Sequence, residues 1–201
     1  PGFAPGAGGS RNRPRPPIKW GVASKSRLLI LVALLLIPSA LFVGLNSDVP
    51  KFCYLHDDCL YFVSAKSMAD GGGYRIASLP GEPPQTKYPP LYPKYLSLAW
   101  KWEPNFPASL RLLIWMNWIF LPVWLALSFN LYRRHGFSQP MSWILIGVMA
   151  LNPTLVLFSV SALTEVLFTC GLLVLFRAME KDGARIAFAA GLIAGLLCLC
   201  R

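Results

Sequence analysis

The sequence contains a series of apolar runs long enough to cross a lipid bilayer, and these runs constrain its fold more than any other feature. A transmembrane helix needs ~17–25 predominantly apolar residues. Hydrophobic residues make up 55% of the chain, which exceeds the usual share in a soluble domain. The sequence therefore predicts an all-α fold, a polytopic bundle of about five transmembrane helices. The expected helices cover residues 28–45, 110–131, 141–158, 165–179 and 184–200.

The net charge of +10 raises the question of a nucleic-acid partner. Six of the 19 basic residues precede Leu28, and others stand at the ends of the apolar runs. Basic residues concentrate at the cytoplasmic ends of membrane helices, and the chain has no recognised nucleic-acid-binding motif. We therefore expect no nucleic-acid partner and interpret residues 1–27 as a disordered basic tail in the cytoplasm.

The apolar run of residues 28–45 has a second interpretation, a cleaved signal peptide. We favour an uncleaved helix because the run is longer than the ~7–15-residue core of a signal peptide. The chain does not begin with Met and stops directly after an apolar run. We therefore expect it to be a piece of a longer protein.

Basic residues also predict which side of the membrane each connection faces. Arg134 and Arg177 stand at helix ends that should face the cytoplasm, like the N-terminal tail. Residues 46–109, between the first two helices, then form a long extracytoplasmic loop on the same side as Glu165 and Arg201. This convergence of ionisable groups makes the loop the candidate site. The predicted location is multi-pass, in a bacterial inner or plasma membrane.

The extracytoplasmic loop has a pattern of its own. Residues 58–70 show a weak helical pattern that Gly71 and its two following glycines should end, which predicts a short interfacial helix. Prolines then follow that should exclude regular helix. These prolines are Pro80, Pro83, Pro84, Pro89, Pro90 and Pro93.

Two adjacent acids, Asp57 and Asp58, are candidate catalytic residues. A carboxylate can deprotonate an acceptor hydroxyl or hold a divalent cation beside a phosphate. The alternative is a helix N-cap, in which an Asp accepts backbone N–H bonds. Both interpretations hold if Asp58 caps the helix while Asp57 faces a cavity. The flanking Cys53 and Cys59 either form a disulfide in an oxidising compartment or remain two free thiols.

Other ionisable residues also have both a functional and a structural interpretation. The helix dipole favours Glu165 at the outer start of a helix, yet ionisable groups at membrane depth are usually functional. Lys87 precedes a proline-rich turn that would hold its ammonium over a phosphate, or it is a solvated loop lysine. Arg201 is a snorkelling cation in the structural interpretation. His56 is expected to be a hydrogen-bonded loop residue.

Several short motifs occur in a fixed order on the predicted outer side. They are His56-Asp57-Asp58-Cys59-Leu60-Tyr61-Phe62, Ala65-Lys66-Ser67-Met68-Ala69-Asp70-Gly71, Thr86-Lys87-Tyr88-Pro89-Pro90-Leu91-Tyr92-Pro93, Thr164-Glu165-Val166-Leu167-Phe168 and residues 196–201. Together they resemble GT-C glycosyltransferases, above all the branch that holds protein O-mannosyltransferases and the aminoarabinose transferases of lipid A. The resemblance covers residues 28–201.

The resemblance implies a glycosyltransferase that takes a sugar from a polyprenyl-phosphate donor. The sugar would pass to an extracytoplasmic lipid, glycan or protein. The implied catalytic residues are Asp57, Asp58 and Glu165, and the implied donor-phosphate contacts are Lys87, Tyr88 and Arg201. Fixed cations would stabilise the charge that grows on the phosphate. Members of this family differ in their dependence on a metal, so the resemblance implies no particular cation.

Two other functions fit a membrane protein of this composition. A transporter subunit usually carries its ionisable sites near the bilayer midplane. Here the acids stand at one edge, which favours the enzyme. A non-catalytic membrane scaffold, whose aromatic loop binds a partner, is the third hypothesis.

Overall fold

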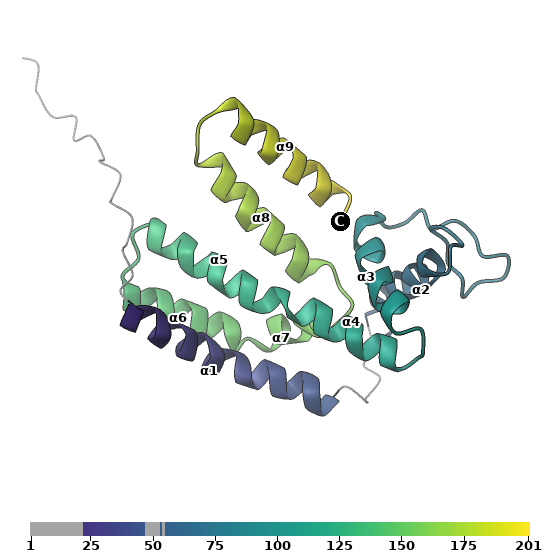
Figure 1. Cartoon of the computed structure of the whole chain (residues 1–201), viewed down its shortest axis with the longest axis horizontal. Helices are drawn as coiled ribbons and strands as arrows, with labels where there is room; N and C mark the ends of the chain where they lie inside the picture. The colour runs from purple at the N-terminus through teal and green to yellow at the C-terminus, as the bar shows by residue number, and fades with distance from the viewer. Residues whose placement is uncertain (1–21, 47–52, 54) are drawn as a thin grey trace, which may run out of the picture.

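The computed structural model of the chain describes residues 22–46, 53 and 55–201 (Figure 1). Within these residues the chain forms nine helices and no strand beyond an isolated bridge, so the all-α prediction is confirmed. The helices are α1 (Val22–Asn46), α2 (Asp57–Ala69), α3 (Leu91–Trp102), α4 (Ala108–Trp118), α5 (Phe120–Arg134), α6 (Gln139–Ala150), α7 (Pro153–Ser159), α8 (Glu165–Met179) and α9 (Ala184–Cys198). Residues 1–21 of the predicted tail lie outside the described residues, and the rest of that segment belongs to α1.

One helix of the described part is long and apolar enough to cross a membrane. It consists of α4 and α5 taken together, Ala108–Arg134, over 27 residues. The pair α6 and α7 passes the same test only as a unit, and it bends by 65°. Two shorter apolar helices are Ile30–Leu45 and Ala184–Cys198. Length and composition therefore indicate one membrane span in the described residues, or two if the bent pair is one span. The core helix of a soluble protein can have the same length and composition.

The break between α6 and α7 follows from the dipeptide Asn152-Pro153. The Asn152 side chain accepts the backbone N–H groups of Thr154 and Leu155 at 2.9 and 3.2 Å, which caps α7. Pro153 occupies the first helical position, where no N–H is needed. Beyond α7, the buried Asn117 of α4 donates to backbone carbonyls, the nearest at 2.7 Å, and ties this segment to α4.

The buried apolar residues form two clusters. The first joins α2, α3 and α4, with the fully buried Tyr92, Leu96 and Leu113 at its centre. Trp100 of α3 also donates its indole N–H to the Phe62 carbonyl of α2, at 3.2 Å. The second cluster joins α5, α6 and α7. Its buried members are Leu121, Leu125, Phe129, Ile146, Ala150 and Leu155. The first cluster holds together the part of the extracytoplasmic loop that carries the candidate site.

The expectation that prolines exclude helix from the second half of the loop is wrong for Pro93. Helix α3 starts at Leu91 and includes Pro93 in its first turn. Proline is tolerated there because the first N–H groups of a helix have no partner within the helix. The loop therefore carries two helices, α2 and α3, instead of one.

Two of the helices bring distant parts of the chain to the loop. Figure 1 shows the C-terminal end of α9 next to α3, and the start of α8 at the same end of the molecule. The Leu91 N–H donates to the Leu199 carbonyl at 2.9 Å, which fastens α3 to the end of α9. The C-terminal ends of α5 and α8 also meet. Arg134 forms an ion pair with Glu180, and Arg177 lies 2.9 Å from the same Glu180 oxygen.

Candidate functional site

The carboxylate of Asp57 is the meeting point of α2 and the proline-rich turn. The Tyr88 hydroxyl donates a hydrogen bond to Asp57 Oδ1. Lys87 Nζ lies 4.0 Å from the same oxygen and 4.8 Å from the centroid of the Tyr88 ring. Hydrogen bonding to Tyr88, supported by the charge of Asp57, raises the pKa of Lys87, so its side chain is an ammonium. The structure thus brings together three of the residues predicted from the sequence.

The turn that carries Lys87 and Tyr88 is fixed by the side chains of Tyr74 and Gln85. The Tyr74 hydroxyl donates to the Tyr88 carbonyl at 2.9 Å, and burial raises the pKa of Tyr74 to about 12, which keeps this donor protonated. The Gln85 side chain, itself buried, accepts the Lys87 N–H at 2.9 Å. The ammonium and the phenol therefore project from an ordered backbone, which favours a binding site over a mobile loop.

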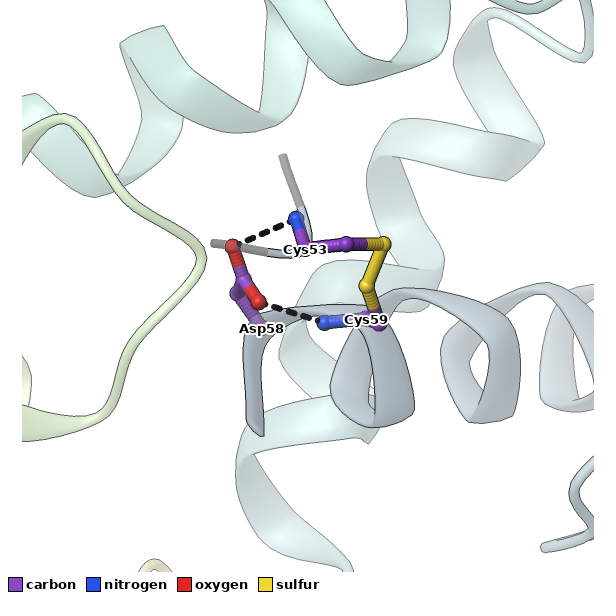
Figure 2. Close-up of a disulfide and its surroundings, with 3 residues drawn as sticks. All are labelled: Cys53, Asp58 and Cys59. Carbon is purple, nitrogen blue, oxygen red and sulfur yellow. Dashed lines mark hydrogen bonds between the residues drawn. A yellow bond between two sulfur atoms is a disulfide. The ribbon is translucent and has the colours of Figure 1, made fainter. Parts of the chain in front are cut away.

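Asp58 has a different environment from Asp57. Its side chain is buried, and its two oxygens accept the backbone N–H groups of Cys53 and Cys59 at 3.0 and 2.9 Å (Figure 2). The two cysteines form a disulfide, which settles the alternatives that the sequence leaves open. Burial raises the pKa of Asp58, although the N–H groups oppose this shift. Asp58 thus accepts one N–H group before α2 and one within its first turn. The N-cap position belongs to His56, so the expectation that Asp58 is the N-cap residue is wrong.

The carboxylates of Asp57 and Asp58 have separate partners and do not bind one common cation. The oxygens of Asp58 are engaged by backbone N–H groups, whereas Asp57 meets a phenol and an ammonium. Within the described ranges, no group of three or more His, Cys, Asp or Glu side chains could hold a metal ion.

Glu165 and Arg201 form a second charged pair at the same end of the molecule. Arg201 Nη1 lies 3.7 Å from Glu165 Oε1, and its guanidinium stands 5.9 Å from the centroid of the Phe168 ring. The other carboxylate oxygen, Glu165 Oε2, is buried and has no hydrogen-bond partner among the described residues. An unpaired buried acceptor costs free energy, so Glu165 Oε2 lacks the donor that a buried carboxylate oxygen usually has.

Tyr61 lies between the two charged groups, and the sequence analysis did not assign it to the site. Its ring centroid is 4.9 Å from that of Tyr88. Thr164, directly before Glu165, lies close enough to affect the pKa of the Tyr61 hydroxyl. Burial raises the pKa of Tyr61 well above its ordinary value, and the charges of Asp57 and Glu165 reinforce this. A sequence signal was present, because residues four apart on a helix share a face and Tyr61 follows Asp57 by four.

The site therefore consists of two charged pairs and one connecting tyrosine. Lys87 and Tyr88 surround Asp57, while Arg201 faces Glu165. His56 is exposed and forms the backbone kink before α2, in keeping with a loop residue. Chemically, each pair offers a carboxylate that can accept a hydrogen bond or a proton, beside a cation that can receive an anionic group.

The chain was compared with known proteins by sequence and by structure. No family model, no curated protein and no solved structure matches it.

Proposed function

We propose that the chain carries the active site of a membrane glycosyltransferase, which moves a sugar from a polyprenyl-phosphate donor to an extracytoplasmic acceptor. One observation carries the proposal. The Asp57 carboxylate is held beside the Lys87 ammonium, and a second acid–cation pair, Glu165 and Arg201, stands at the same end of the helices. Transfer of a sugar from a phosphate needs a carboxylate that removes the proton of the acceptor hydroxyl. It also needs cations that stabilise the leaving phosphate.

The residues divide the chemical work between the acceptor and the donor. Asp57 takes the proton of the acceptor hydroxyl while the acceptor oxygen bonds to the anomeric carbon of the sugar. The bond from that carbon to the phosphate oxygen breaks, and its electron pair leaves with the phosphate. Lys87 and Arg201 stabilise the growing negative charge. Tyr88 orients the Asp57 carboxylate and contacts the donor, while Glu165 holds Arg201 and accepts a hydrogen bond from the substrate.

Several observations support a multi-pass arrangement with the loop outside the cell membrane. Large apolar side chains are exposed on α1, α6 and α9, for example Leu34, Val148 and Phe188, and lipid would cover them. A disulfide fits an oxidising compartment. The Arg134–Arg177 end is basic, as the cytoplasmic end of membrane helices usually is. The membrane is then a bacterial inner or plasma membrane, and the bilayer is itself a partner.

A reconstitution experiment tests the proposal and separates it from its two rivals. The full-length protein is placed in proteoliposomes with a panel of labelled polyprenyl-phosphate sugars and a membrane extract that supplies acceptors. Consumption of one donor, with label in a product, would support the enzyme. Uptake of solute without sugar transfer would instead identify a transporter subunit. Neither activity, in a protein that is correctly inserted, would favour the scaffold.

A further inference from the structure

A disulfide links Cys53, which precedes α2, to Cys59 in the first turn of α2, and the Asp58 carboxylate binds the backbone of both cysteines. Cys53 and Cys59 are six residues apart and their Cα atoms are separated by 4.9 Å. Asp58 Oδ2 accepts the N–H of the first cysteine and Oδ1 the N–H of the second (Figure 2). Because Asp58 is 2% exposed, water does not compete for these bonds. The disulfide and the Asp58 hydrogen bonds thus restrain the same two residues, Cys53 and Cys59.

The backbone within this closed segment has an unfavourable conformation. Cys53 has a φ of 71° and His56 a φ of 57°. A positive φ is unfavourable for a residue other than glycine, and such conformations persist where the surrounding structure imposes them. His56 also directly precedes α2 and makes no side-chain capping bond. The entry of the chain into α2 therefore depends on an external restraint.

Asp57 stands inside this closed segment and begins α2. Its carboxylate is 43% exposed and reaches Lys87 and Tyr88 across a gap of about thirty residues in sequence. The direction of a side chain at the first position of a helix follows the backbone that leads into it. Any restraint on that backbone is consequently a restraint on where the carboxylate lies.

We propose that the Cys53–Cys59 disulfide and the Asp58 carboxylate form a two-part clamp that positions Asp57 against the Lys87–Tyr88 turn. Asp58 is then a positioning residue rather than a catalytic one. The effect of the clamp on sugar transfer rests on the proposed function, but the geometry does not. The rival explanation is that packing of α2 on α3, through Phe62 and Trp100, holds Asp57 without help.

Opening the clamp is a defined chemical step. A dithiol reductant such as dithiothreitol supplies two electrons and two protons, the S–S bond breaks, and two cysteine thiols and the oxidised reagent result. The segment then gains conformational freedom that the cross-link had removed. The Asp58 hydrogen bonds remain, so the clamp is weakened rather than abolished.

The distance between Asp57 and Lys87 allows a test that requires no enzymatic activity. A water-soluble carbodiimide joins a carboxylate to a neighbouring amine as an amide, while the reagent takes up the lost water and becomes a urea. The yield of the Asp57–Lys87 amide, measured by mass spectrometry after digestion, reports how often the two groups meet. The pair Lys66–Asp70, 2.5 Å apart at the far end of α2, gives an internal reference for an intact helix.

The comparison uses wild type, the double variant Cys53→Ser/Cys59→Ser, wild type treated with dithiothreitol, and Asp58→Asn. We expect the Asp57–Lys87 yield to fall about fivefold or more in all three altered forms, while the reference amide is unchanged. The matched control is Cys198→Ser, which removes an exposed free cysteine of α9 and should leave both yields unchanged.

Two results would overturn the proposal. Equal Asp57–Lys87 yields with and without the disulfide would mean that packing of α2 alone positions the carboxylate. A parallel fall of the reference amide would mean that the disulfide maintains α2 as a whole. A protein that transfers no sugar at all would refute the proposed function and leave the cross-linking result standing.

Discussion

The Tyr88 hydroxyl donates to the Asp57 carboxylate although the two residues are 31 positions apart. Hydrogen bonds to charged groups contribute about 1.5–3 kcal/mol, so Tyr88→Phe should lower sugar transfer about tenfold or more. The phenyl ring would keep its packing against Tyr61, so the melting temperature should fall by no more than the loss of this one hydrogen bond implies, at about 2–4 °C per kcal/mol. Initial rates measure this. Tyr132→Phe, at the far end of α5, is the control. An unchanged rate in Tyr88→Phe would show that the bond does not orient the carboxylate.

Substitution of Arg201 should affect donor binding but not the stability of the fold. Its side chain is 56% exposed, and exposed ion pairs contribute about 0–1 kcal/mol to stability. We therefore expect Arg201→Ala to leave the melting temperature nearly unchanged, because an exposed side chain makes both its pair with Glu165 and its contact with the Phe168 ring. The KM for the donor should rise about tenfold, since a charge-assisted contact with the phosphate disappears.

Two variants accompany the Arg201 measurement. Arg201→Lys should recover part of the donor affinity, because lysine keeps the charge without the bidentate geometry of arginine. Arg185→Ala, at the opposite end of α9, should behave as wild type. A marked loss of thermal stability in Arg201→Ala, with an unchanged KM, would assign this residue a structural role.

Much of the helical pattern can be predicted from the sequence, but α3 cannot. Uninterrupted apolar runs determine α5, α8 and α9, because apolar length alone decides them. Pro93 conceals α3, since whether proline breaks a helix depends on its distance from the helix start.

The candidate site is also only partly predictable. The acids and cations can be recognised by residue type, and their common side follows from charge. Which cation meets which acid depends on tertiary packing. The pairing of Lys87 with Asp57 and of Arg201 with Glu165 is set by the contacts of α3 with α2 and α9. Local propensity carries no information about such pairings.

The buried carboxylate of Asp58 predicts a pH dependence of stability. Burial raises its native pKa above the ordinary value of 3.8, so the native state holds the proton more tightly than the unfolded state. The contribution of Asp58 to stability is then complete below pH 3.8 and is lost as the pH rises through the native pKa. The melting temperature of wild type minus that of Asp58→Asn should therefore decrease with rising pH over this window.

Melting curves in detergent, recorded at closely spaced acidic pH values, measure this difference. Glu82→Gln, which removes an exposed acid of the same loop, gives the reference for general charge effects. A difference that grows as the pH rises would contradict the burial of Asp58.

The contact between α8 and α9 is tight at one glycine. A Cβ atom at Gly171 would lie 2.4 Å from Leu197 Cδ2, which is closer than atoms approach without displacement. Overpacking of this kind costs about 1–3 kcal/mol, whereas alanine gains about 1 kcal/mol over glycine in a helix. Gly171→Ala should therefore melt several degrees below a Gly→Ala variant at an open helical position, at about 2–4 °C per kcal/mol.

Gly195 provides the matched control, because a Cβ atom there meets no neighbour within 4 Å. Gly195→Ala should leave the melting temperature unchanged or raise it slightly, since alanine favours a helix. Equal melting temperatures of Gly171→Ala and Gly195→Ala would contradict the packing of α9 on α8 that places Arg201 beside Glu165.

The most direct test of the proposed function is donor consumption by wild type and by Asp57→Asn, measured on the reconstituted full-length protein. Asparagine keeps the shape of the side chain but cannot take the acceptor proton. General base catalysis contributes about 10²–10⁴-fold. The rate should therefore fall by at least about a hundredfold, while Asp70→Asn, an exposed acid at the end of α2, stays near wild type. Wild-type turnover by a correctly inserted Asp57→Asn protein would contradict the role assigned to this residue.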